Sequence, residues 1–600
     1  MKRRHDMPFG ARCGAGSTRF RLWAPACERV RLVLGREQAR EMPMASQEGG
    51  WHALEVEGVG AGEAYAFRID DGPPIPDPAS RFNPWDVNGA SLVVDPEAYE
   101  WRDSEWRGRP WREAVVYELH VGTFTFEGTY LAAIAKLDHL VRLGITAIEL
   151  LPLADFSGTR NWGYDGVLPF APDASYGRPE ELKRLVDEAH QRGLMVLLDV
   201  VYNHFGPEGN HLSRYAPQFF NAAHQTPWGA AINFDGEACG TVRSFFLHNA
   251  LYWIEEYHFD GLRMDAIHAI ADDSPKHIVV EIAEAIAAGP GRERPVHQVL
   301  ENEANRASLL ERGRPNPTAQ WNDDAHHAWH VLATGETDGY YKDYADRTAW
   351  RLARTLAEGF GYQGEPSTVK GGERRGEPST HLPPEAFVQF LQNHDHVGNR
   401  ALGERLNALA RPQALRLAAA SLCLAPQIPL FFMGEEFGAT TPFLFFCDFH
   451  GELADAVREG RRREFAGFER FRDAKAREAI PDPNAQETFA ASRLDWACVG
   501  EKPHSDWLEF HRALLALRAL EIVPRLGDKP LQGRFEVAGR CGVSVAWTLA
   551  DGARLHLRAS FGDESAPLAV APGRVIHREG EPPRADSMPP WSGAWTLEAR

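Results

Sequence analysis

The sequence predicts an α/β protein in which a (β/α)8 TIM barrel lies between an N-terminal β-sandwich domain and a C-terminal antiparallel β domain. Three observations support this prediction. Residues 1–95 alternate apolar and polar side chains with the period of two that half-buried strands show. From Val115 the chain alternates short apolar segments with amphipathic helical stretches, which is typical of parallel strands joined by helices. From about residue 525 the two-residue alternation returns.

Composition sets the broad class of protein. With 600 residues, 44% hydrophobic and 25% charged, the chain can form several folded domains. Its net charge of −19 repels nucleic acid backbones and acidic membrane surfaces. We therefore expect no nucleic acid and no membrane partner. Because the sequence shows no signal peptide and no spanning segment, we expect a cytoplasmic location. The seven cysteines are scattered without a CxxC pair, which favours reduced thiols.

The N-terminal domain is predicted over residues 1–95. Its clearest strands lie around Phe20–Ala24, Val30–Leu34 and Tyr65–Ile69, where every second residue is apolar. A Pro-rich stretch at 71–84 interrupts this pattern and indicates a wrapping loop or linker.

Eight apolar segments predict the barrel strands of a catalytic domain over residues 96–524. The segment at 319 is the weakest of the eight and is assigned partly because it completes the count. Helical patterns lie between them; one, with Leu182, Leu185, Val186 and Ala189 on one face, is closed by Gly193. The strands are expected to begin near residues 115, 145, 195, 259, 297, 319, 387 and 429.

The remainder of the chain is predicted as a charged segment and a β domain over residues 525–600. The segment 460–478 mixes basic and acidic residues and favours a solvated helix face. Within the β domain, Val543–Leu549 and Leu555–Ala559 flank an Asp551-Gly552 turn and predict a hairpin.

Charged and amide residues follow several predicted barrel strands at the point where each strand ends. The C-terminal ends of barrel strands converge on one mouth, so these side chains are expected to face one another. Three acids stand out among them: Asp265, Glu301 and Asp395. Cleavage of a glycosidic bond with retention needs a nucleophilic carboxylate and a protonated carboxyl about 5 Å apart. A barrel mouth can supply that pair.

Each of these residues also has a structural interpretation. Arg263, two residues before Asp265 on the same strand face, can serve as its ion-pair partner; we expect it also to keep the nucleophile ionised. His204 and His394 can be core histidines, but their amide and acid neighbours favour a role as donors to sugar hydroxyls.

Four motifs now establish a family resemblance: DVVYNH at 199–204, GLRMDAIH at 261–268, VLENE at 299–303 and FLQNHD at 390–395. Together and in this order they resemble the signature regions of the α-amylase superfamily, glycoside hydrolase family 13. The resemblance implies that Asp265 is the nucleophile, Glu301 the general acid/base and Asp395 the acid that stabilises the distorted transition state. It also implies that Tyr164 stacks under the sugar in the −1 subsite.

Longer motifs at 319–344, 376–406 and 431–449, with PDPASR at 76 and SRLDW at 492, resemble the members that act on maltooligosyl trehalose. This implies a glycosidase of trehalose biosynthesis that cleaves the α-1,4 bond next to the terminal trehalose. Two departures, His396 where Gln is expected and Phe437 where Trp is usual, leave the subsite preference open. Further substrate-binding candidates are His268, Trp321, Asn322, Asp324, Arg400 and Glu436.

Two alternatives remain. One is a glycogen branching or debranching enzyme of the same superfamily, and the other is a noncatalytic glucan-binding barrel. The presence of all three acids favours an enzyme. The expected partners are maltooligosyl trehalose and related α-glucans. Because the chemistry needs no metal and no DxDxDG loop occurs, we expect no cofactor and no metal ion.

Overall fold

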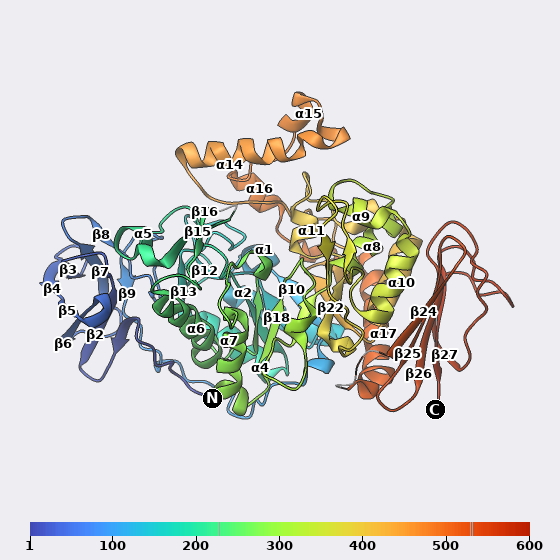
Figure 1. The fold of residues 1–600 in the computed structure, drawn as a ribbon, viewed down its shortest axis with the longest axis horizontal. Coiled ribbons are helices and arrows are strands. Elements are labelled where there is room, and N and C mark those ends of the chain that lie inside the picture. The colour runs from blue at the N-terminus through green and yellow to red at the C-terminus, as the bar shows by residue number, and fades with distance from the viewer. Residues whose placement is uncertain (227–228, 528–529, 531, 600) are drawn as a thin grey trace.

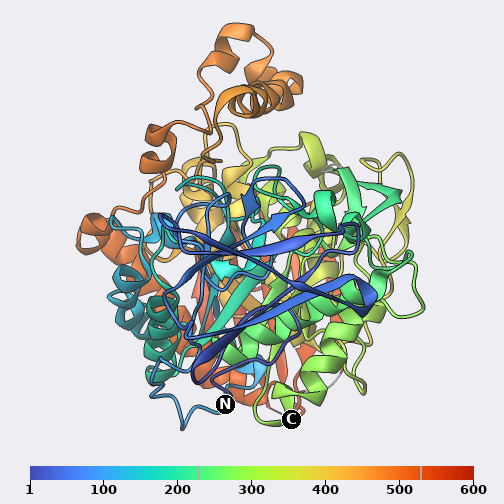
Figure 2. The ribbon, with the colours of Figure 1, turned by 90° about the vertical axis from the view of Figure 1, so that its left-hand side faces the viewer.

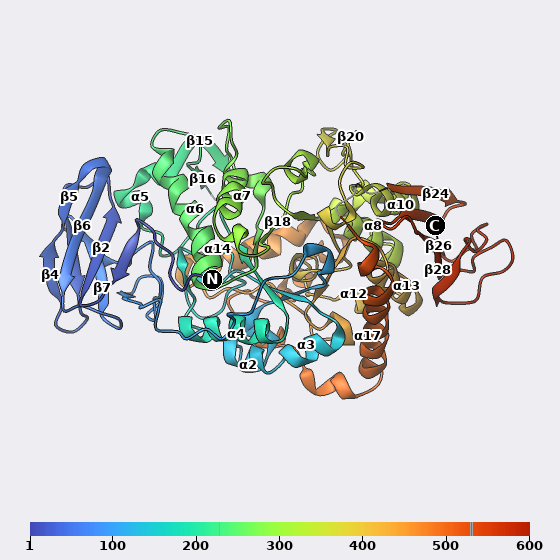
Figure 3. The same ribbon diagram turned by 90° about the horizontal axis from the view of Figure 1, so that it is seen from below.

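The computed structural model describes residues 1–226, 229–527, 530 and 532–599. Figure 1 shows three parts in a row: an N-terminal β domain, a central barrel, and a C-terminal sheet on the opposite side of the barrel, and the view from below agrees (Figure 3). The predicted fold class is confirmed, since the barrel is closed and a β domain lies at either end.

The N-terminal domain contains two antiparallel sheets that enclose buried side chains such as Phe20, Leu32 and Phe67. Figure 2 shows these sheets crossing in front of the barrel. The alternation read from the sequence places every second side chain between the sheets. One sheet contains β1 (Gly10–Cys13), β2 (Ser17–Trp23), β6 (Trp51–Glu57) and β5 (Ala45–Gln47); the other contains β4 (Arg40–Pro43), β3 (Val30–Leu34), β7 (Ala64–Ile69), β8 (Pro74–Ile75) and β9 (Ser91–Leu92).

Eight parallel strands close the barrel, and the segment at 319 is one of them. Apolar residues run through these strands because both faces are buried, one inside the barrel and one against the outer helices. In chain order, which is also their order around the barrel, they are β10 (Val116–Leu119), β11 (Ala147–Leu150), β14 (Met195–Val200), β17 (Gly261–Met264), β18 (His297–Leu300), β19 (Ala319–Trp321), β22 (Phe387–Phe390) and β23 (Ile428–Phe432).

Helices cover the outside of the barrel. The stretch that begins at Tyr130 forms two short helices, α2 (Tyr130–Ile134) and α3 (Leu137–Leu143), and α3 is capped by Gly144, which has a φ of 106°. Gly tolerates this left-handed conformation and so closes the helix before β11. The longer helices are α4 (Pro179–Gln191), α6 (Cys239–Glu256), α7 (Ile278–Ala288), α8 (Asp323–Thr334), α10 (Thr348–Glu358), α13 (Pro412–Cys423) and α17 (His504–Glu521).

Short helices and hairpins form the loops around the barrel. The hairpins are β12 (Ala154–Asp155) with β13 (Leu168–Pro172), β15 (Phe220–Thr226) with β16 (Gly229–Ile232), and β20 (Glu365–Pro366) with β21 (Arg374–Arg375). The helices are α1 (Val121–Phe124), α5 (Leu212–Tyr215), α9 (Lys342–Ala345), α11 (His394–Gly398), α12 (Leu406–Leu409) and α16 (Gln486–Ala491).

An arm of the chain, formed by α14 (Gly451–Glu464) and α15 (Ala474–Glu478), projects above the barrel (Figures 1 and 2). Most of the described residues of α14 have exposed or half-buried side chains, but Arg461 is buried and donates to the carbonyl oxygens of Gly398 and Arg400 at 2.7 and 3.0 Å. One residue of the predicted solvated face therefore attaches the arm to the end of α11 and to the loop that follows it.

The C-terminal sheet has the strand order β24-β25-β26-β28-β27, and the predicted hairpin is confirmed as β25 paired with β26. Trp547 and Trp595 are buried in this domain, and the Trp547 indole N–H donates to the Leu356 carbonyl on α10 at 2.7 Å. This hydrogen bond helps to dock the sheet on the barrel. The strands are β24 (Gln532–Ala538), β25 (Gly542–Thr548), β26 (Arg554–Ser560), β27 (Arg574–Glu579) and β28 (Ser592–Glu598).

All seven cysteines are free thiols. Within the described residues, no helix has both the length and the apolar character needed to cross a membrane.

A buried ion pair fastens the Pro-rich loop between the N-terminal domain and the barrel. Arg81 in this loop lies 3.2 Å from the carboxylate of Glu256 at the end of α6, and both side chains are almost fully buried. The same carboxylate accepts from the His5 backbone N–H at 3.2 Å, and the Arg81 guanidinium also donates to the Ala11 carbonyl. One carboxylate therefore links the terminus, the loop and the barrel.

We predict that Glu256→Gln lowers the apparent melting temperature by several degrees. The substitution leaves a buried guanidinium without its counter-charge, which costs about 3 kcal/mol in comparable sites. Asp6→Asn is the matched control, because the Asp6–Arg12 pair is exposed and contributes little. Thermal unfolding followed by circular dichroism measures both; equal midpoints for the two variants would contradict the assignment.

Candidate active site

The guanidinium of Arg263 lies at the centre of the barrel mouth and is fully buried. It donates to Asp199 at 2.6 Å, to Asp265 at 2.9 Å and to Glu301 at 2.8 Å. Its flat face lies over the Trp321 ring, with 4.0 Å between the guanidinium carbon and the ring centroid. One cation thus connects carboxylates from three neighbouring strand ends.

Asp265 and Glu301 owe their position to adjacent barrel strands. Each directly follows its strand, β17 or β18, and its backbone N–H continues the hydrogen bonding of the sheet, with Val200 or Met264 as acceptor. The strand ladder therefore fixes both Cα positions, while Arg263 fixes both side chains.

The two carboxylates have different hydrogen-bond environments. Both oxygens of Asp265 accept from side chains, Oδ1 from Arg263 at 2.9 Å and Oδ2 from Asn203 at 2.7 Å, which favours the ionised form. Both donors to Glu301, the Arg263 guanidinium and the Ala266 N–H, contact Oε2 at 2.8 Å. A proton can therefore reside on Oε1 of Glu301.

The pKa of Glu301 reflects this environment. Burial and the nearby charges of Asp265 and Asp395 raise the pKa of Glu301 to about 7, against the opposing effect of Arg263. Burial also raises the pKa of Asp265, again opposed by Arg263. A carboxyl with a pKa near neutrality beside a carboxylate with two donors can supply acid and nucleophile to one reaction.

Asp395 is held by a histidine of the opposite charge. It lies in α11 just after β22, and the His394 Nε2 is 3.3 Å from its carboxylate. Burial alone would lower the pKa of His394, but Asp395 and Glu118 raise it well above its usual value. Burial would raise the pKa of Asp395, but His394, Arg263 and His396 together lower the pKa of that carboxyl below its usual range. Asp395 is therefore an anion paired with an imidazolium.

Tyr164 and His204 border the same site. The half-buried ring of Tyr164 stacks on His394 with 5.1 Å between centroids, and its hydroxyl donates to Asp199 at 2.6 Å. The His204 Nε2 donates to the Tyr164 carbonyl at 2.9 Å. Tyr164 can present its open face to a sugar, whereas His204 supports Tyr164 from a buried position.

Four of the predicted substrate-binding residues at the mouth are packed against other parts of the protein. Trp321, Asn322, Asp324 and Glu436 are buried, each with at most 1% of its surface exposed. Trp321 packs under Arg263, and the Asn322 amide donates to the Gly359 carbonyl at 2.8 Å. Glu436 accepts from Tyr117 and lies 3.0 Å from His139 of α3, outside the barrel. In this structure these side chains contact other groups of the protein, and their burial argues against direct contact with a substrate.

Asp324 was expected to face the barrel mouth, but on α8 it is the preceding residue, Asp323, that lies on that side. The Asp324 carboxylate accepts from Asn305 and from the Gly361 and Tyr362 N–H groups at 2.7 to 2.9 Å. The preceding residue, Asp323, is the half-buried one, and its charge and that of Glu301 influence each other. Because successive helical residues point about 100° apart, only one of the two can face the catalytic acids.

His268 and Arg400 remain candidates for substrate binding. His268 is exposed, and its Nδ1 accepts from the Glu303 N–H at 3.4 Å. The Arg400 guanidinium is bound by both carboxylate oxygens of Glu336, at 2.8 and 3.0 Å, and keeps 20% of its side chain exposed.

Three residues of the site were absent from the predicted set: Asn203, Asp199 and Glu118. Asn203 and Asp199 stand in the DVVYNH motif at a strand end, so that motif carried the signal for both. Glu118 lies inside β10, and its only signal is an acid within an apolar strand. Its carboxylate accepts from both the backbone and the ring of His394.

Comparison with known families agrees with this architecture. The alpha amylase catalytic domain model matches residues 93–224, and carbohydrate-binding module 48, the isoamylase N-terminal domain, matches residues 8–96. A domain of unknown function, DUF3459, matches residues 530–595.

Individual relatives that are similar over most of the chain identify the family more narrowly. Malto-oligosyltrehalose trehalohydrolase from Deinococcus radiodurans is 45% identical over 84% of this chain and 81% of its own length. The protein of that name from Brevibacterium helvolum is 37% identical over 96% and 98%. A crystal structure of a Salmonella typhimurium protein, 46% identical, covers 99% of this chain and 100% of its own with a TM-score of 0.94.

The closed barrel, the grouped carboxylates and these matches define a glycoside hydrolase of the α-amylase superfamily, family 13. More narrowly, the chain belongs to the malto-oligosyltrehalose trehalohydrolase family.

We predict that kcat/KM for hydrolysis falls as the pH rises through about 7. The acid that protonates a leaving oxygen must hold its proton, and the pKa of Glu301 is raised to about 7. Glu301→Gln should abolish this limb of the kcat/KM profile and reduce kcat by roughly 10²- to 10⁴-fold. The more exposed Glu303→Gln is the control and should retain the limb. A limb that persists in Glu301→Gln would assign it to another group.

Proposed function

We propose that the chain hydrolyses, with retention, the α-1,4-glucosidic bond next to the terminal trehalose of maltooligosyl trehalose, releasing trehalose and a maltooligosaccharide. The observation that supports the chemistry is the shared contact of Arg263 with Asp265 and Glu301, whose surroundings favour different protonation states. The names of the relatives support the substrate.

In the first step the Asp265 carboxylate attacks the anomeric carbon of the glucose before the trehalose unit. Glu301 donates its proton to the glycosidic oxygen as that bond breaks, so trehalose leaves as a neutral alcohol. The covalent glycosyl ester on Asp265 retains the maltooligosaccharide. Arg263 stays bound to both carboxylates and offsets the charge that moves from Asp265 to Glu301.

In the second step Glu301, now ionised, accepts a proton from water, and the water oxygen attacks the same carbon. The ester bond breaks and Asp265 leaves as a carboxylate, so two inversions give net retention. Asp395 can hold the hydroxyls of the distorted ring, because its pairing with His394 keeps it ionised. Tyr164 can stack beneath the ring.

We predict that Asp265→Asn lowers kcat by more than about a thousandfold, because an amide is a poor nucleophile at the anomeric carbon. Asp273→Asn, an exposed acid in the loop after β17, is the matched control and should keep normal turnover. The assay is release of reducing sugar from maltotriosyl trehalose. Full activity in Asp265→Asn would falsify the proposed mechanism.

The substrate is tested with two oligosaccharides of five glucoses each, maltotriosyl trehalose and maltopentaose. We expect faster cleavage of the first, with trehalose and α-maltotriose as the initial products by NMR. A site that pairs its polar groups with trehalose hydroxyls loses those partners with maltopentaose, which penalises the wrong substrate. Faster cleavage of maltopentaose would overturn the trehalose assignment. Longer or branched products would instead favour a branching enzyme.

A further inference from the structure

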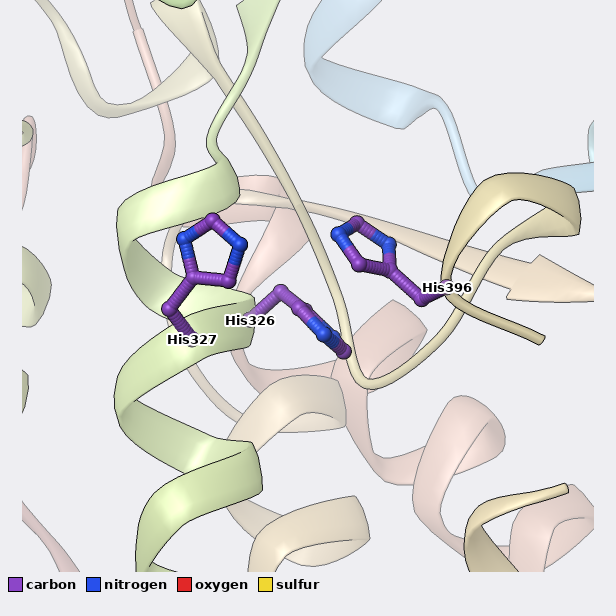
Figure 4. Close-up of side chains that lie close together, drawn as sticks. All are labelled: His326, His327 and His396. Carbon is purple, nitrogen blue, oxygen red and sulfur yellow. The ribbon is translucent and has the colours of Figure 1, made fainter. Parts of the chain in front are cut away.

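Three histidines lie together beside the catalytic acids, on the two helices that follow β19 and β22. His326 and His327 are neighbours on α8, and His396 is on α11, next to Asp395 (Figure 4). One ligand atom from each imidazole lies within 4.8 Å of the others. The His326 and His396 rings are in contact, with 3.5 Å between centroids. The mechanism proposed above uses none of the three.

Hydrogen bonds fix which nitrogen two of these rings can offer. The His326 Nδ1 lies 2.7 Å from the Leu391 carbonyl, and the His396 Nδ1 lies 2.7 Å from the Asn393 side-chain oxygen. Both acceptors require a protonated Nδ1, so each Nε2 carries a lone pair. Metal-bound histidines are commonly held by the same kind of hydrogen bond on the other nitrogen.

Figure 4 shows that His327 turns its Nε2, and not its Nδ1, toward His396. Its Nδ1 is buried and makes no hydrogen bond within the described part of the chain.

The cluster is held in the unprotonated form that metals bind. Burial and the neighbouring imidazoles lower the pKa of His326 and of His327 well below the usual value. Burial lowers the pKa of His396 to about 3, despite the opposing charge of Asp395. A cation therefore need not displace protons from these rings near neutral pH.

We propose that His326, His327 and His396 form a binding site for one divalent first-row transition ion of the Zn²⁺ class. Three neutral imidazoles without a carboxylate suit Zn²⁺ or Co²⁺ and not the hard cations Mg²⁺ and Ca²⁺. Three protein ligands leave a fourth position for water. The Tyr341 hydroxyl, 3.2 Å from His326 Nε2, gives up that contact when the ion binds.

The mouth of the barrel gives an ion access to this cluster. His396 is half-buried, and Asp395 beside it keeps a third of its side chain exposed. On the other side, Tyr340 is 44% exposed and packs on His327 with 4.9 Å between ring centroids. The ion would lie near Asp395, although hydrolysis by paired carboxylates does not require it.

The experiment titrates the full-length protein, first stripped with a chelator, with Co²⁺, whose visible d–d absorption reports imidazole ligation. We expect one Co²⁺ to bind and Zn²⁺ to displace it, whereas Mg²⁺ and Ca²⁺ do not. His327→Gln and His396→Gln should each weaken Co²⁺ binding by about tenfold or more. Gln keeps the size of the side chain at both positions.

His224→Gln is the matched control, because His224 belongs to a second, more exposed group with Asp235 and Asp273. It should bind Co²⁺ as the unaltered protein does. Melting temperatures show whether each variant is folded. If only one of His327→Gln and His396→Gln folds, Co²⁺ binding by that variant is sufficient to test the site. The site would be overturned by the absence of a d–d band or by a cobalt–thiolate band in its place. It would also be overturned if folded His327→Gln or His396→Gln bound Co²⁺ as tightly as the unaltered protein.

Discussion

The arrangement of the active site depends on the burial of one guanidinium, that of Arg263. A fully buried cation is stable only if nearby anions and hydrogen bonds replace the water it has lost. Asp199 and Asp265 supply anions and Glu301 a further hydrogen-bond acceptor, all from the ends of three adjacent strands, and Trp321 covers the flat face. Closure of the barrel therefore brings the acids together. The acids in turn offset the free-energy cost of burying the Arg263 guanidinium.

A second ion pair gives the site its electrostatic asymmetry. His394 is surrounded by Glu118 and Asp395, which together raise its pKa and keep it charged despite burial. Asp395 gains from this pairing and stays ionised, whereas Glu301 shares Arg263 with two other carboxylates and has its pKa raised to about 7. In a poorly solvated mouth such pairings act strongly. The distribution of two cations among several acids thus decides which carboxyl keeps a proton.

The sequence sufficed to predict the barrel and the grouping of the acids, because both follow from periodicity and from the convergence of strand ends. The sequence did not suffice to predict how deeply each side chain is buried. Trp321 and Asp324 stand beside polar residues at a strand end, as a binding residue would, yet one lies beneath Arg263 and the other faces the interior of the loops. Glu436 follows β23 but faces α3. Local pattern shows where a strand ends; only the packing of distant segments shows which face a side chain takes.

The burial of Asp324 bears on how this protein shapes the mouth of its barrel. Its carboxylate joins Asn305, Gly361 and Tyr362, residues from separate loops, and the guanidinium of Arg375 at 2.9 Å neutralises it. These partners are buried backbone and side-chain donors that would otherwise lack an acceptor. Because one carboxylate accepts from all of them, it holds the loops on this side of the mouth in one arrangement. Asp323, the preceding residue on α8, is then positioned beside a carboxylate that is fully buried. Selectivity on this side of the mouth is therefore expected to depend on buried residues as much as on those in contact with the sugar.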